Sequence, residues 1–108
     1  MQDCKVNILG TEYKIRFEKF GDKDIDGYTD PTSFEIVLRN DNDNEVGDFD
    51  ELQRKQLRHE VIHAFMSESG LQCNWQHTQQ FGQDETTVDW FAIQSPKIFK
   101  VFQELDIL

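Results

Sequence analysis

Two histidines and a glutamate near the middle of the chain have the spacing H-E-x-x-H, in His59, Glu60 and His63. On a helix, residues four apart share one face and lie about 6 Å apart along the axis, so both imidazoles can reach one metal ion. Glu60 points to the side of this pair, where its carboxylate can take a proton from water without binding the metal. The spacing therefore predicts a zinc hydrolase site with His59 and His63 as ligands and Glu60 as general base.

The segment that carries this motif is typical of a helix that begins near Asp48 or Asp50 and ends at Gly70, with no internal proline or glycine. Apolar residues recur at helical spacing opposite the motif and form a broad arc: Leu57, Val61, Ile62, Ala64, Phe65 and Met66. We expect the helix to be buried on most sides. Polar side chains on such a helix need a partner, and a metal ion can serve all three.

Glu85 is the preferred third ligand. If residues 83–94 form a helix, Glu85 and Asp89 lie four apart on one face and point inward. The apolar residues beside that face are Val88, Phe91 and Ala92. One carboxylate can then bind the ion while the other accepts a hydrogen bond from a ligand imidazole. His77 and Cys73 remain alternative ligands, since both side chains suit zinc.

Together, H-E-x-x-H within residues 58–65 and E-x-x-x-D within residues 85–92 resemble the gluzincin class of zinc peptidases. The amino-acid sequences of both segments are most similar to minimal gluzincins of the ImmA/IrrE type and their small phage-encoded relatives, and the resemblance covers about residues 28–96. The resemblance implies a minimal zincin-like fold and one zinc ion. It also implies that His59, His63 and Glu85 are ligands, that Glu60 is the base and that Asp89 supports His59. In that family the acid-bearing helix reads roughly E-x-x-A-N-x-F-A, from which the chain departs at two positions.

The resemblance further implies hydrolysis of a peptide bond in a narrow protein substrate, such as a transcriptional repressor in a bacterial or phage-infected cell. His77 and Tyr28 are the candidates for a group that stabilises the oxyanion. A second class of protein also fits the sequence, namely a non-catalytic interaction domain that a closed metal site stabilises. Glu60 favours the enzyme, because a structural site has no need of a carboxylate beside the ion. A chain that binds no metal is the third alternative, and manganese or iron are alternatives to zinc.

Residues 22–27 repeat the opening D-x-D-x-D-G of a calcium-binding EF-hand loop. The pattern fails at its twelfth position, where Ser33 replaces the glutamate that binds calcium through both oxygens. We therefore interpret the segment as an acidic turn that leads into a strand.

The remaining segments predict a scaffold of class α+β, with a small antiparallel sheet of about three strands followed by three helices. Residues 6–9 and 13–17 have the pattern of a hairpin, and residues 34–39 that of a third strand with Phe34, Ile36 and Leu38 on one face. If this third strand lies at the sheet edge, it can pair with an extended peptide, although a covering loop is an equal alternative. Ser95 and Pro96 are expected to start the last helix, whose core residues recur at helical spacing: Ile98, Phe99, Val101, Phe102 and Leu105.

A chain of 108 residues can bury one modest core, so we expect one domain over residues 1–108. The formal net charge of −10 argues against binding to nucleic acid or to anionic membranes. The sequence has neither a signal peptide nor an apolar run of membrane-spanning length, which favours the cytoplasm. Cys4 and Cys73 are then expected to be free thiols.

Overall fold

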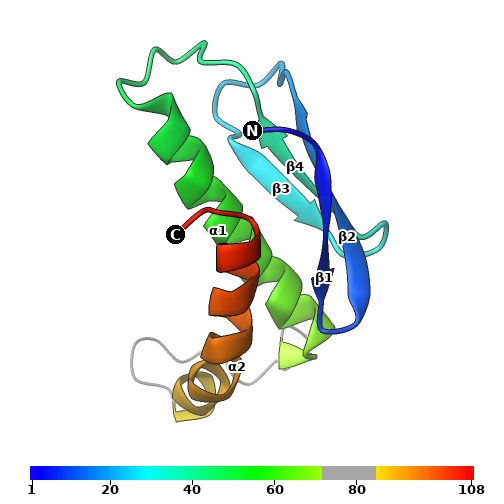
Figure 1. Ribbon diagram of the computed structural model, residues 1–108. Coiled ribbons are helices and arrows are strands. Elements are labelled where there is room, and N and C mark those ends of the chain that lie inside the picture. The colour runs from blue at the N-terminus through cyan, green and yellow to red at the C-terminus, as the bar shows by residue number, and fades with distance from the viewer. Residues whose placement is uncertain (72–84) are drawn as a thin grey trace.

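A computed structural model describes residues 1–71 and 85–108, in the latter range without the side chains of Glu85, Thr86, Val88, Asp89 and Ala92. Its elements are β1 (Cys4–Ile8), β2 (Thr11–Glu18), β3 (Gly27–Asp30), β4 (Glu35–Arg39), α1 (Phe49–Glu68) and α2 (Glu85–Glu104). The two helices pack on one face of the sheet, and α2 crosses in front of α1 in the view of Figure 1. The fold is therefore α+β, as predicted. Within the described residues, neither helix combines the length and the apolar character needed to cross a bilayer.

The sheet has the strand order β1-β2-β4-β3. The hairpin of β1 and β2 is present as predicted, and β3 pairs with β4 antiparallel, but β2 and β4 run parallel. The prediction of a three-stranded antiparallel sheet is therefore wrong, because the chain inserts β3 before it returns to β2. β4 is also internal rather than at the edge. The edge strand on that side is β3, a four-residue segment without apolar alternation that ends before Pro31.

α1 begins and ends where the sequence predicted. The carboxylate of Asp48 accepts a hydrogen bond of 3.0 Å from the backbone N–H of Glu51, and Gly70 follows the helix with a φ of +83°. The apolar stripe is buried as expected and consists of Leu57, Val61, Ala64 and Phe65. The expectation that the helix is enclosed on most sides is wrong, however, because His59 and His63 are exposed.

α2 is one continuous helix where the sequence predicted two. Pro96 lies inside it, at the position expected to be a helix start. A proline removes one backbone hydrogen bond, but the stripe of Ile98, Val101 and Phe102 packs into the core and stabilises the continuous helix. Phe99, expected to be a core residue, is 47% exposed, and Phe91, in the apolar arc beside Glu85 and Asp89, is 46% exposed.

The C-terminal end of α1 is tied to the hairpin by Glu68. Its two carboxylate oxygens accept hydrogen bonds of 2.8 Å from the hydroxyls of Tyr13 and Thr11. Tyr13 is fully buried, and this burial, together with the hydrogen bond to Glu68 and its charge, raises the pKa of the phenol well above its usual value. Ser69, the residue after α1, accepts a hydrogen bond from the indole of Trp90, which joins α2 to the same region.

Candidate functional site

The imidazoles of His59 and His63 converge on the exposed face of α1. Their Nε2 atoms lie 3.1 Å apart, and the rings meet edge to face with centroids 4.7 Å apart. Two nitrogen ligands of one tetrahedral zinc ion, each ~2.05 Å from it, are about 3.3 Å apart. The two side chains therefore fit two adjacent ligand positions on one ion.

Glu60 points away from this pair, toward β3. Its Oε1 accepts a hydrogen bond of 2.8 Å from the hydroxyl of Thr29, which also lies 3.0 Å from the backbone oxygen of Glu60. Its Oε2 accepts a hydrogen bond of 2.5 Å from the amide of Gln56, one turn earlier on α1. With only 4% of its surface exposed, Glu60 is a buried carboxylate whose two oxygens are each held by one donor.

A cleft of about 550 Å³ lies between α1 and β3. From α1 it is lined by Gln56, His59, Glu60, His63 and Ser67, and from the other side by Asp24, Ile25, Asp26, Gly27, Tyr28, Thr29 and Pro31. Its volume lies within the range of about 300–1,000 Å³ that is typical of ligand sites. The structure thus brings the whole H-E-x-x-H motif to one open cleft beside a sheet edge.

The edge strand β3 presents backbone groups to this cleft. The backbone N–H of Arg39 donates to the backbone oxygen of Asp26 at 3.0 Å, which makes these two residues a hydrogen-bonded pair of the antiparallel ladder. Because bonded and non-bonded pairs alternate, Tyr28 is the next bonded residue, and the backbone groups of Gly27 and Thr29 point away from β4. Within the described residues, no strand pairs with that outer edge.

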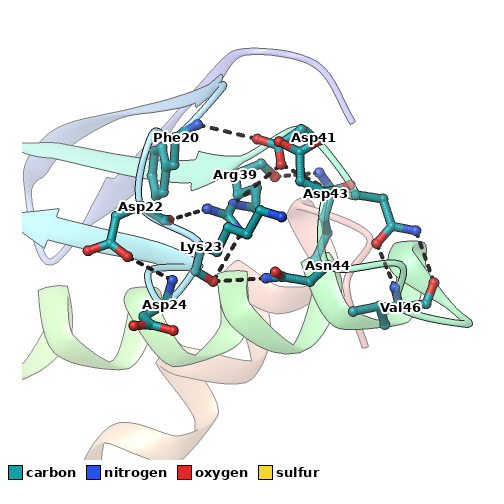
Figure 2. A network of polar contacts seen from close by, with 11 residues as sticks. Phe20, Asp22, Lys23, Asp24, Arg39, Asp41, Asp43, Asn44 and Val46 are labelled. Carbon is teal, nitrogen blue, oxygen red and sulfur yellow. Dashed lines mark hydrogen bonds and ion pairs between the residues drawn. The ribbon is translucent and has the colours of Figure 1, made fainter.

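The loop before β3, which forms the far wall of the cleft, is anchored by Arg39 at the end of β4. Figure 2 shows the Arg39 guanidinium donating hydrogen bonds to the backbone oxygens of Asp22 and Lys23. The guanidinium also lies 3.6 Å from a carboxylate oxygen of Asp41 and 5.7 Å from the centre of the Phe20 ring. Arg39 is only 3% exposed, so these contacts are shielded from water and hold the wall of the cleft firmly.

Two more contacts stiffen the same loop. The amide of Asn44 donates to the backbone oxygen of Lys23 at 2.8 Å, and the backbone N–H of Phe20 donates to Asp41 at 3.3 Å (Figure 2). Burial acts to raise the pKa of the Asp41 carboxyl, but hydrogen bonds from the backbone of Asp43 and Phe20 and the charge of Arg39 outweigh it and hold that pKa below its usual value.

The segment that begins like a calcium loop is a turn, as we interpreted it. One carboxylate oxygen of Asp22 accepts a hydrogen bond of 2.9 Å from the backbone N–H of Asp24, the contact of an Asx turn. Among the residues whose side chains the structure describes, no three His, Cys, Asp or Glu groups are placed to hold one metal ion.

Of the predicted third ligand, Glu85, the structure describes the backbone and not the side chain. The backbone of Glu85 forms the start of α2, and the side chains of Glu85 and Asp89 lie outside the described residues, as do Cys73 and His77. Tyr28, the other candidate for the oxyanion, lines the cleft from β3. Cys4 is a free thiol, as expected.

Sequence reasoning missed Thr29 and Gln56, the two donors to Glu60. For Gln56 a signal existed, because it lies four residues before Glu60 on a helix and such pairs are neighbours. For Thr29 none existed, because its contact depends on how β3 docks against α1.

Comparison of the chain with protein-family models, curated proteins and solved structures gave no match.

Proposed function

We propose that this chain is a zinc-dependent metallopeptidase that hydrolyses a peptide bond in a narrow, regulatory protein substrate. The observation that carries the proposal is the separation of 3.1 Å between the Nε2 atoms of His59 and His63, in a cleft that Glu60 also lines. Hydrolysis of this kind needs converging imidazole ligands, a carboxylate beside them and room for substrate. The likeness of the two motifs to ImmA/IrrE-type gluzincins suggests the reaction and a repressor-like substrate in a bacterial or phage-infected cytoplasm.

In this proposal His59, His63 and Glu85 hold one zinc ion within a zincin-like fold, and Asp89 supports His59. A bound ion would supply Lewis acidity toward water and toward the substrate carbonyl. The exposure of both imidazoles supports a catalytic rather than a closed site, because a catalytic zinc keeps one coordination position free.

Glu60 is the proton acceptor. Its carboxylate takes a proton from the attacking water while the water oxygen bonds to the carbonyl carbon, and the proton then passes to the departing nitrogen as the C–N bond breaks. Thr29 and Gln56 hold one carboxylate oxygen each, which restricts rotation of the carboxylate. Each oxygen still has a free lone pair, so Glu60 remains able to accept a further hydrogen bond from water.

The substrate would bind in extended form along β3. The outward backbone groups of Gly27 and Thr29 can pair with a peptide as an added strand, which brings its backbone alongside the face of α1 that carries His59 and His63. β3 would thus do what the sequence suggested for residues 34–39 if that strand lay at the sheet edge.

Metal content of the purified chain tests the proposal, because a 3.1 Å separation also fits a hydrogen bond between two neutral imidazoles. We expect about one zinc per chain by inductively coupled plasma mass spectrometry, lost in His63→Ala and in Glu85→Ala. Zinc retained in Glu85→Ala would move the third ligand to His77 or Cys73. No metal in the wild-type chain after reconstitution would refute the proposal.

Peptidase activity is tested by Glu60→Gln, which has nearly the same shape: its amide oxygen can accept from Gln56, and its amide nitrogen can donate to the hydroxyl of Thr29. We expect the variant to bind zinc as the wild type does and to lose cleavage of a protein substrate by at least about a hundredfold. Full activity in the variant would remove Glu60 from the mechanism.

One observation favours the second candidate, a non-catalytic interaction domain stabilised by metal. The hydrogen bond between Glu60 and Thr29 also joins α1 to β3, and the one from Gln56 holds the carboxylate within α1, so the carboxylate has a structural role without any reaction. A zinc-loaded chain whose unfolding temperature falls sharply on chelation, and which cleaves nothing, would support this candidate.

A further inference from the structure

A second pocket adjoins the cleft on the far side of β3. It has a volume of about 250 Å³ and is lined mainly by Phe20, Ile25 and Tyr28, with Glu18, Lys19, Gly21 and Asp22 around them. This volume is below the range of about 300–1,000 Å³ of small-molecule sites and suits a single side chain. Ile25 and Tyr28 are each 43% exposed, so a ligand in the pocket would cover apolar surface that now faces water.

The pocket and the cleft share a wall. Ile25 and Tyr28 line both of them, from the loop before β3 and from β3 itself. Side chains of a strand alternate between its two faces. Thr29 points toward α1, where it bonds Glu60, so Tyr28 points to the opposite face, where its ring stacks on Phe20 with centroids 6.1 Å apart.

We propose that this pocket is a specificity site that accepts one bulky apolar side chain of an extended peptide bound along β3. The inference rests on the proposed function. A peptide paired with β3 alternates in the same way as β3, so one of its side chains faces His59 and His63 and the next lies over Tyr28. The substrate class is therefore an extended segment with a large apolar residue adjacent to the residue at the motif.

The pocket is built before any ligand arrives. Arg39 packs against the Phe20 ring and binds the backbone of Asp22 and Lys23 (Figure 2). The backbone N–H of Ile25 donates to the backbone oxygen of Asp22 at 3.4 Å. These contacts fix both the aromatic and the aliphatic walls. A preformed pocket loses little entropy on binding, which favours discrimination between side chains.

The test is affinity selection from a synthetic heptapeptide library that is randomised at three central positions. The immobilised bait is the full chain with Glu60→Gln, loaded with zinc, and retained peptides are sequenced by mass spectrometry. We expect one position to be enriched about tenfold in Leu, Ile, Met or Phe. The enrichment should vanish when Ile25→Ser and Tyr28→Thr are added to the bait, and persist with Ile93→Ser, which removes an apolar residue of α2 that is 65% exposed.

The outcomes separate this inference from the proposed function. If the bait with Ile25→Ser and Tyr28→Thr is folded, as judged by circular dichroism, and keeps the apolar preference, the pocket assignment is overturned. It is also overturned if the Glu60→Gln bait selects no apolar residue at any position. Enriched peptides that the zinc-loaded wild-type chain binds but does not cleave would support the pocket and refute the peptidase.

Discussion

The hydroxyl of Thr29 on the edge strand β3 donates a hydrogen bond of 2.8 Å to Oε1 of Glu60 on α1. This bond crosses from the sheet to the helix at the centre of the cleft. Glu60 is 4% exposed, so loss of the Thr29 hydroxyl would remove a hydrogen bond from a largely buried carboxylate.

Thr29→Val should reduce the free energy of unfolding by about 1–3 kcal/mol, because it leaves one oxygen of a buried carboxylate without its donor. Thr29→Ser keeps the hydroxyl and should cost less than about 1 kcal/mol. Urea titrations of the three proteins measure both values. A loss in Thr29→Ser with none in Thr29→Val would mean that the methyl group, and not the hydrogen bond, stabilises the contact.

Gly27→Ala should destabilise the edge strand. A Cβ at this position would lie 2.7 Å from Cδ2 of Leu38, 3.0 Å from the backbone oxygen of Val37 and 3.3 Å from Cγ of Gln56. We expect a loss of about 1–3 kcal/mol, since the strand must move away from β4 or α1. Gly47→Ala is the control, with no atom within 4 Å of its Cβ, and should change the unfolding temperature little.

Tyr13 should make the protein lose stability in alkali. The phenol has a pKa of about 10 in an unfolded chain. Burial and the contact with Glu68 raise its pKa in the folded state, so the folded chain keeps a proton that the unfolded chain releases. The stabilisation is complete below pH about 10 and falls above it by up to ~1.4 kcal/mol per pH unit.

This alkaline slope should be absent in Tyr13→Phe and present in Tyr28→Phe, whose ring is 43% exposed. Denaturant titrations measure this slope between pH 8 and pH 11, from about two units below to about one unit above the phenol pKa of the unfolded chain. A slope that persists in Tyr13→Phe would show that the Tyr13 phenol is not its cause.

Arg39→Met should loosen the wall of the cleft. The backbone oxygens of Asp22 and Lys23 lose their guanidinium partner, and we expect a loss of about 2–4 kcal/mol together with faster trypsin cleavage after Lys23. Arg54→Met removes a partly exposed arginine from α1 and should change neither quantity by much. Wild-type cleavage rates in Arg39→Met would show that other contacts suffice to hold the loop.

Local patterns predicted the elements that depend on local physics. α1 was predictable because Asp48 caps it, Gly70 ends it and its apolar stripe has helical spacing. The hairpin of β1 and β2 was predictable from alternation around Gly10. The motif histidines converge because residues four apart on a helix must be neighbours.

The missed features depend on contacts between distant segments. β3 has four residues and a single aromatic side chain, and it becomes a strand through its register with β4. The parallel pairing of β2 with β4 has no sequence signal at all. Pro96 suggested a helix boundary, but the partly buried Trp90 before it and the buried stripe after it pack against the same core, which favours one helix.

All described residues that line the cleft fall within one stretch of chain, residues 24–67. The hairpin of β3 and β4 and the helix that follows are sequence neighbours, so closing the cleft costs little loop entropy. We therefore expect this unit to assemble early in folding, before α2 arrives from the far end of the chain. An ion that also bound Glu85 would fasten α2 to an already finished cleft, and metal uptake would then be a late step of maturation.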